Sequence, residues 1–153
     1  MYWSYQKTFT FLLTLALIFG GGYAVYRYAS AGQQLVNWWN GGEALPVVCT
    51  LSEYKIDRSI TMTIYLKGRL MRSEWEQYEP EFYNRFHSVL LGEEVYTWGE
   101  GTDIGVRTSF TEFTHEGPAT KSDFEDANCS PWWNPDDSIF DVPYDVRFEA
   151  RGA

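Results

Sequence analysis

An uncharged, strongly apolar run of 18 residues, Phe9 to Tyr26, lies near the start of this 153-residue chain, between Lys7 and Arg27. As an α-helix, a run of this length is about 27 Å long, just short of the hydrocarbon core of a bilayer. Aromatic residues flank it where membrane proteins carry interfacial belts, namely Tyr2, Trp3, Tyr5, Tyr26 and Tyr28. The sequence therefore predicts a membrane-anchoring helix within residues 1–29.

The same run is compatible with a cleaved signal peptide. Phe9 to Phe19 has the length of a signal-peptide core, and Ala29 to Ala31 has the small-x-small pattern of a cleavage site. Because Arg27 separates that site from the apolar core, we favour the retained anchor. Both interpretations export the rest of the chain, either as a single-pass protein of the cell membrane with its domain outside the cytoplasm or as a secreted or periplasmic protein. A buried core helix is a third possibility.

Charge is distributed unevenly along the chain. All 21 Asp and Glu residues lie at Glu43 or later, and from Gly32 onward they are accompanied by only 10 Lys and Arg residues, a net charge of −11. A surface this acidic repels phosphate groups. We therefore expect no nucleic-acid partner, and anionic lipid headgroups are disfavoured as partners of this part of the chain.

The only two cysteines, Cys49 and Cys129, are about 80 residues apart. Cysteines of an exported domain usually pair, so we predict a disulfide bond between them. Two free, buried thiols are the alternative.

The hydrophobic pattern changes after the apolar run. Residues 30–46 show no clear period and contain Gly, Gln, Asn and Pro, which predicts a linker, followed by a β-domain over 47–153. In residues 60–66 apolar and polar side chains alternate, as in a strand with one buried face. A turn at 67–68 and a second alternating run over 71–76 complete a predicted β-hairpin.

Further strands are predicted at 47–54, 86–91, 95–98 and 144–148, with residues 92–94 as the turn of a second hairpin. Residues 105–113 fit either a strand or a short helix. At least six strands, with no sustained helical period after Arg27, predict a mainly β fold. We expect a curved antiparallel sheet or open half-barrel.

The segment CSPWWNPDDSIFDVP, residues 129–143, places two tryptophans between two prolines. Prolines at 131, 135 and 143 argue against a regular ladder of hydrogen bonds. We therefore predict a C-terminal strap, tied down by the disulfide, that covers one end or face of the sheet. The strap either closes the core or lines a hydrophobic pocket.

Sequence signatures of catalysis are absent. The chain contains no G-x-S-x-G, no phosphate-binding glycine loop and no H-E-x-x-H. His87 has no metal-ligating residue at a suitable spacing. We therefore expect a protein that is not an enzyme and that holds no metal or other cofactor.

Two runs, SITMTIYLKGRLMRSEWEQ and LLGEEVYTWGEG, resemble the periplasmic lipoprotein-carrier proteins of bacteria and related exported β-domains. The resemblance covers about 45 residues, and the matching positions are Gly68, Met71, Arg72, Gly92, Tyr96 and Trp98. It implies an incomplete, curved antiparallel sheet with a hydrophobic cavity for acyl chains. The carriers cover that cavity with helices, whereas here the strap is expected to cover it.

A second resemblance is to type IV pilin-like subunits, which also combine an N-terminal apolar helix, a β-domain and a late disulfide. The run KTFTFLLTLALIF is similar to their N-terminus, although Thr8 and Leu13 stand where they have Gly and Glu. This resemblance implies a subunit of an envelope or pilus-like assembly.

Together these features predict an envelope protein, anchored or exported, whose β-domain binds a hydrophobic ligand such as a lipid acyl chain. Apolar and aromatic side chains from the strands and the strap are the expected lining of its cavity: Ile60, Met62, Ile64, Trp75, Trp98, Trp132 and Trp133. The alternative is a structural or interaction subunit with an ordinary filled core and an envelope protein as its partner.

Overall fold

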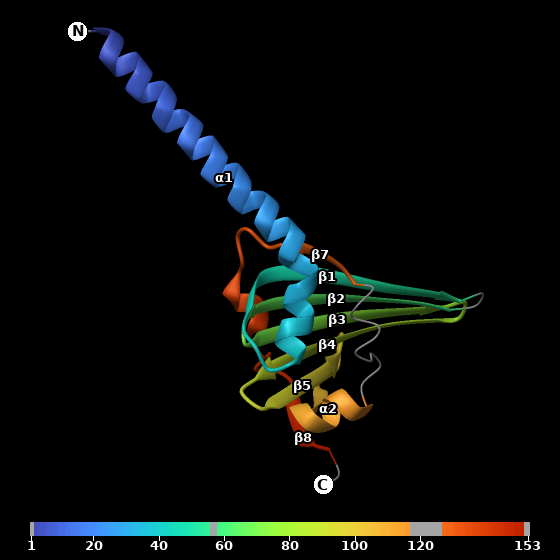
Figure 1. Cartoon of the computed structure of the whole chain (residues 1–153). Helices are drawn as coiled ribbons and strands as arrows, with labels where there is room; N and C mark the ends of the chain where they lie inside the picture. The colour runs from blue at the N-terminus through green and yellow to red at the C-terminus, as the bar shows by residue number, and fades with distance from the viewer. Residues whose placement is uncertain (1, 56–57, 117–126, 152–153) are drawn as a thin grey trace.

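The computed structural model describes residues 2–55, 58–116 and 127–151. Within these residues, two α-helices, eight strands and one short 3-10 helix follow one another (Figure 1). Their bounds are α1 Tyr2–Trp39, β1 Ala44–Lys55, β2 Arg58–Gly68, β3 Leu70–Glu79, β4 Phe82–Leu91, β5 Glu94–Gly99, β6 Ile104–Ser109, α2 Phe110–Glu116, β7 Asn128–Pro131, η1 Asp137–Phe140 and β8 Arg147–Ala150.

All eight strands form one open sheet in the order β7-β1-β2-β3-β4-β5-β6-β8. The mainly β prediction is confirmed, but the sheet is mixed and is not closed into a barrel. Every described pair is antiparallel except β6 and β8, which are parallel. The reason is the connection: the chain leaves β7 at one edge, crosses the whole sheet and reaches the other edge running in the direction of β6.

Two tight turns fix the register of the hairpins. Gly68 and Gly92 open the turns between β2 and β3 and between β4 and β5, with φ of 61° and 65°. A positive φ at the first central residue is typical of the type II′ turn, which matches the twist of the flanking strands and favours Gly there. Both predicted hairpins are therefore confirmed. Residues 105–113, which the sequence left open, are divided between the end of β6 and the start of α2.

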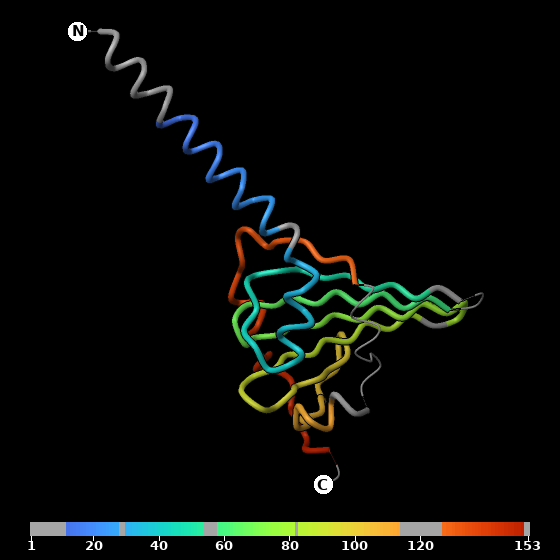
Figure 2. Tube along the Cα trace, in the orientation of Figure 1, coloured from blue at the N-terminus to red at the C-terminus, as the bar shows by residue number. Residues whose placement is uncertain are grey.

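The helix α1 has two halves that bend by 48° between Leu12–Arg27 and Ser30–Trp39. Figure 2 shows the first half leaving the sheet and the second half lying along it. Ala31, Leu35 and Trp38 of the second half are buried in the hydrophobic core. Their spacing of four and three residues places them on one face of the helix.

Residues 30–46 were predicted to form a linker; the first ten of them continue the helix α1, and this part of α1 packs on the domain. The helix ends at Trp39, and Gly41 two residues later, with a φ of 87°, provides the left-handed residue that commonly follows a helix end. Gln34 is buried, and its side-chain oxygen accepts a hydrogen bond from the backbone N–H of Leu45 at 2.9 Å. A polar residue on the buried side thus ties α1 to the start of β1.

Residues 1–29 were predicted to hold a single membrane-anchoring helix, and the structure does not support this. Across the part of the chain that it describes, no one helix combines the length and apolarity of a membrane span. Leu12–Arg27 and Ser30–Trp39 meet both criteria only when they are taken together as a bent pair.

The sheet has two covered faces, which we call the helix face and the strap face. The second half of α1 and the side chains Phe110 and Phe113 of α2 pack on the helix face, whose buried residues are Val47, Cys49, Met62, Ile64, Leu66, Met71, Leu90 and Val95. The strap, residues 132–146 (orange to red in Figure 1), lies on the other face. There the Trp132 ring packs on Tyr65 at 5.6 Å, and Arg72 donates a hydrogen bond to the carbonyl of Ile139 at 2.8 Å.

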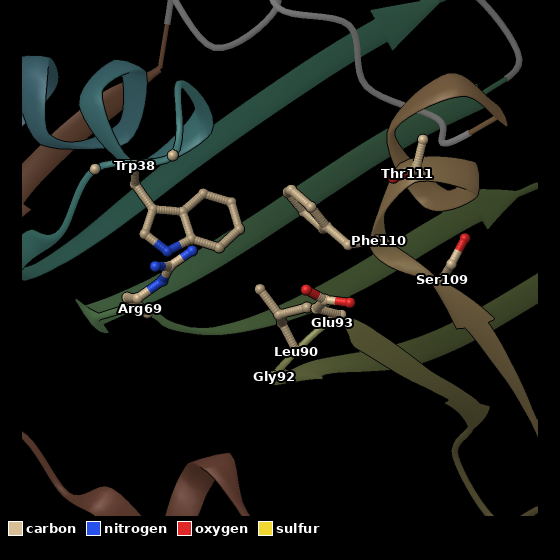
Figure 3. Close-up of a pocket in the computed structure, with 10 residues that line it drawn as sticks. Trp38, Arg69, Leu90, Gly92, Glu93, Ser109, Phe110 and Thr111 are labelled. Carbon is tan, nitrogen blue, oxygen red and sulfur yellow. The ribbon is translucent and has the colours of Figure 1, made fainter.

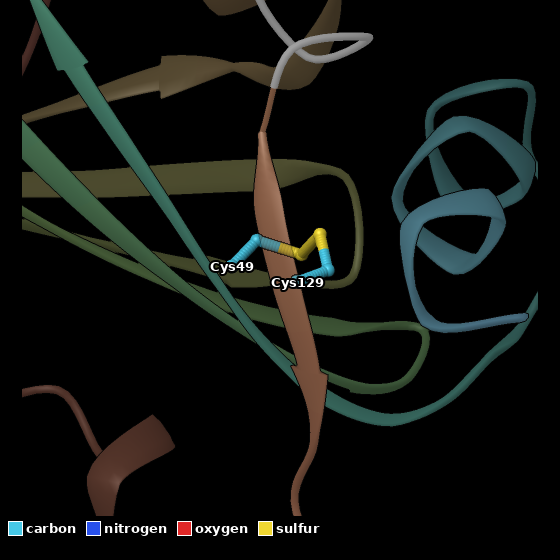
Figure 4. The surroundings of a disulfide bond; sticks show 2 residues. All are labelled: Cys49 and Cys129. Carbon is cyan, nitrogen blue, oxygen red and sulfur yellow. A yellow bond between two sulfur atoms is a disulfide. The ribbon is translucent and has the colours of Figure 1, made fainter. Parts of the chain in front are cut away.

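The predicted disulfide between Cys49 and Cys129 is confirmed and joins β1 to β7 (Figure 4). The two cysteines are directly opposite each other in the ladder, with their Cα atoms 4.0 Å apart. The start of the predicted strap needs a correction, since Asn128–Pro131 does form a strand. It lies at the sheet edge with Pro131 as its last residue, where a missing N–H is tolerated.

Candidate functional site

A pocket of about 320 Å³ lies at the end of the sheet where α1 finishes (Figure 3). Four separate segments meet there: the end of α1, the β2–β3 turn, the β4–β5 turn and the junction of β6 with α2. The lining residues are Trp38, Gly41, Gly42, Arg69, Leu90, Gly92, Glu93, Ser109, Phe110 and Thr111. This volume is at the lower end of the range for small-molecule sites.

Two aromatic rings form the apolar wall of the pocket. Trp38 and Phe110 meet edge to face with centroids 5.6 Å apart, and Phe110 also contacts Trp39 at 6.2 Å. The backbone N–H of Phe110 donates to the carbonyl of Glu93 at 2.8 Å, which fixes α2 against the β4–β5 turn.

Two opposite charges flank this wall. Figure 3 shows the Arg69 guanidinium on the Trp38 side and the Glu93 carboxylate on the Phe110 side. Neither forms an ion pair within 4.0 Å with a residue that the structure describes. The pocket can therefore hold a small ligand with an apolar body and a charged group.

The polar side chains in the lining of the pocket are two charged groups and two hydroxyls, those of Arg69, Glu93, Ser109 and Thr111. Ser109 Oγ accepts a hydrogen bond from the backbone N–H of Glu112 at 3.2 Å, and neither His nor Cys is among the described residues that line the site. Among residues 2–55, 58–116 and 127–151 there is no cluster of three or more His, Cys, Asp or Glu side chains that could hold a metal ion.

The seven residues predicted to line a cavity do not come together. Met62 and Ile64 are buried on the helix face, where Trp75 packs against them. Ile60 lies on the same face of β2, nearer the start of the strand, and is half-buried. Trp98 and Trp132 lie on the strap face. Trp133 is half exposed beside α1, at a ring distance of 6.4 Å from Tyr23. Because the sheet separates the first group from the second, one cavity cannot contain them all.

Sequence reasoning missed the aromatic wall. Trp38 lies in the segment predicted to be a linker, although the pair of adjacent tryptophans, Trp38 and Trp39, stands out in the sequence. Phe110 lies in the segment that fits either a strand or a short helix. An i, i+4, i+7 pattern of Ala31, Leu35 and Trp38 was the available signal. It was weak because Gly and Gln lie between these positions.

A network of polar side chains lies on the strap face, away from the pocket. Arg72 donates to Glu74 at 3.0 Å and lies 3.0 Å from Nδ1 of His87. Arg85 donates to the other oxygen of Glu74 at 3.1 Å. The His87 ring stacks on Trp98 with centroids 5.4 Å apart. Since Arg72 also binds the Ile139 carbonyl, this network connects the sheet to the strap.

Burial lowers the pKa of His87 below its ordinary value of about 6.5, and the positive charges of Arg72 and Arg85 lower it further, while Glu74 and Glu100 raise it. A lowered pKa means that the fold prefers the neutral ring. This contribution to stability is present above pH 6.5, roughly, and is lost as the pH falls toward the pKa of the folded state.

We therefore expect His87→Gln, which cannot be protonated, to lose less stability than the unchanged protein between pH 7.5 and pH 5. Urea unfolding followed by tryptophan fluorescence at both pH values measures the difference. Equal losses in the two proteins would show that the pKa of His87 is the same in the folded and the unfolded chain.

No protein-family model, curated protein or solved structure matches the chain.

Proposed function

We propose that this chain is a membrane-anchored envelope protein whose β-domain lies outside the cytoplasm and binds a small apolar ligand without catalysing a reaction. The observation that supports the anchor is the first half of α1. Its large apolar side chains are exposed to solvent from Leu12 to Tyr26, and they include Leu12, Leu13, Leu17, Ile18, Phe19, Tyr23, Val25 and Tyr26.

These side chains point in every direction around the helix axis. At about 100° per residue, positions 12, 13, 17, 18 and 19 already cover most of a full turn. A helix that docks on one partner is apolar on one face only, whereas a helix that is apolar all round is enclosed by lipid or by a protein core. The first half of α1 is outside the core of its own domain, which favours lipid.

The disulfide supports export independently. Disulfides persist in oxidising compartments and are rare in the cytosol. Cys49 is fully buried and is paired with Cys129 across adjacent strands, so the bond is part of the folded domain.

Flotation with liposomes tests the anchor. We expect the full chain, refolded from detergent into phosphatidylcholine vesicles, to float with the lipid. Ile18→Lys places a charge in the middle of the apolar half at a cost of about 3 kcal/mol, which should leave most of the protein at the bottom of the gradient. Ser52→Lys adds the same charge on an exposed strand position and should float normally. An Ile18→Lys protein that floats equally well would contradict the anchor.

The pocket between α1, α2 and the two turns supports the proposed binding of a small apolar ligand. A fatty acid fits its chemistry, with the chain against Trp38 and Phe110 and the carboxylate at Arg69. We expect native mass spectrometry of protein taken from its own envelope to show one added small molecule. Arg69→Glu should lower the bound fraction several-fold, while Arg147→Glu, far from the pocket, should not. A bare polypeptide in every preparation would exclude a stably bound ligand.

A subunit of a pilus-like assembly is the second candidate. A helix that is apolar all round is also enclosed when several copies bundle together, and α1 projects from its domain as such a bundle requires (Figure 1). The molar mass measured by light scattering in mild detergent distinguishes the two candidate functions. An anchored binding protein is expected to be a monomer, whereas an assembly subunit is expected to form large oligomers.

A further inference from the structure

We propose that Trp133 of the strap rests in the headgroup region of the bilayer that holds α1, so that the strap as well as the helix positions the domain at the membrane. The inference rests on the proposed membrane anchor. It assigns a lipid contact to a residue more than 100 positions after the apolar run.

The strap meets α1 at Trp133. The Trp133 ring lies 6.4 Å from the ring of Tyr23, and the Arg27 guanidinium lies 5.2 Å from the Trp133 centroid. Arg27 also donates hydrogen bonds to the hydroxyl of Tyr23 at 3.2 Å and to the carbonyl of Pro46 at 2.8 Å. The Arg27 side chain therefore contacts the strap, α1 and the start of β1 at the same time.

This junction marks the end of the apolar half of α1. Arg27 is the only charged residue between Leu12 and Gly42. It is 7% exposed, whereas its neighbours Trp133 and Tyr26 are 52% and 60% exposed. The charge is thus covered by the protein, and the surface around it is aromatic.

Two neighbouring tryptophans take opposite positions in the strap. Trp132 packs inward on Tyr65, and its backbone N–H donates to the Pro46 carbonyl at 2.9 Å. The disulfide at Cys129 holds the same segment to β1. Trp133 is therefore presented outward from a fixed backbone, which limits the entropy that is lost when its ring is immobilised at a surface.

The chemistry of this surface favours a bilayer interface over a soluble partner. Trp and Tyr have an apolar body and one polar group, and they are enriched at the boundary between hydrocarbon and water. The exposed rings of Trp133 and Tyr26 lie beside the exposed apolar side chains of the first half of α1. A membrane that encloses the first half of α1 reaches them directly.

The charges of the protein determine which lipid headgroups favour the Trp133 contact. Arg27 already has protein partners for its guanidinium, so it is not available to pair with lipid phosphate. The chain from Gly32 onward carries a net charge of −11, which anionic headgroups repel. The contact is therefore expected to form best with zwitterionic lipids such as phosphatidylcholine.

Fluorine NMR on the full chain tests the contact. The protein is made with 5-fluorotryptophan and placed in phosphatidylcholine nanodiscs, and Trp133→Phe and Trp75→Phe identify two of the seven tryptophan signals. A lipid with a gadolinium chelate on its headgroup should broaden the Trp133 signal several-fold more than the Trp75 signal. Trp133 is half exposed, so its replacement by Phe is expected to leave the fold intact.

The outcomes separate the two proposals. Equal, weak broadening of both signals in protein that co-purifies with the discs would overturn the Trp133 contact and leave the anchor standing. Protein that does not enter the discs would overturn both. Discs with phosphatidylglycerol at low salt are expected to reduce the broadening of the Trp133 signal, and an increase there would overturn the preference for zwitterionic lipid.

Discussion

Replacing Cys49 and Cys129 together by alanine is expected to lower the free energy of unfolding by about 4.5 kcal/mol, according to the chain-entropy model for a closed loop of this length. The bond joins residues 80 apart and therefore restricts more than half of the unfolded chain. The folded state contributes a second reason. The edge strand β7 has only four residues and ends in Pro131, so few backbone hydrogen bonds hold the strap without the bond.

Urea unfolding of the full chain in mild detergent, followed by circular dichroism, measures this effect. Reducing agent supplies a matched control, because it should shift the unchanged protein toward the stability of the double variant and leave the variant itself unaffected. A loss of less than about 1 kcal/mol in both experiments would show that the unfolded chain is already compact or that native contacts hold the strap.

Much of the sheet could be predicted from the sequence because its strands alternate. Ile60, Met62 and Ile64 lie on one face with Trp75, as the period of two and the turn at Gly68 require. Such a pattern shows which residues share a face of one hairpin. It does not show how the next hairpin continues the register. Trp98 is opposite His87, whereas Trp75 is opposite Phe86, so the two tryptophans lie on different faces.

The segments that cover the sheet were harder to predict than its strands, for a related reason. Alternation identifies a buried face but not the segment that buries it. We expected the strap to cover the sheet, and it covers one face, while the other face is covered by residues assigned to a linker. The ten residues from Ser30 to Trp39 include Gly32, two glutamines and an asparagine, which hides a helix whose stability comes from tertiary packing.

A strand was predicted at 144–148, and β8 lies at Arg147–Ala150, but its parallel pairing with β6 could not be predicted. Its direction depends on where the strap crosses the sheet, which no local pattern records. Phe148 lies over Gly105 where β8 pairs with β6: a Cβ atom on Gly105 would lie only 2.5 Å from the Phe148 ring. Glycine at this position lets the ring of β8 lie over β6 and pack against Tyr96 and Trp98, at 5.2 Å and 6.0 Å.

The division of α1 into two halves leads to the second large expected effect. Leu35→Ala is expected to lower the free energy of unfolding of the β-domain by about 2 to 5 kcal/mol. Leu35 is 1% exposed and belongs to the same core as Val47, Ile64 and Leu66. A shift of this size corresponds to a melting temperature lower by at least about 8 °C for a domain of this size.

Leu17→Ala is the matched control, because it is the same substitution in the same helix. Leu17 is exposed and touches no part of the core, so its loss should change the stability of the domain by less than about 0.5 kcal/mol in detergent. Thermal unfolding by circular dichroism compares the two variants. If both variants melt at the same temperature as the unchanged protein, residues 30–39 behave as a linker. If both variants lose the same stability, the first half of α1 also packs on the domain.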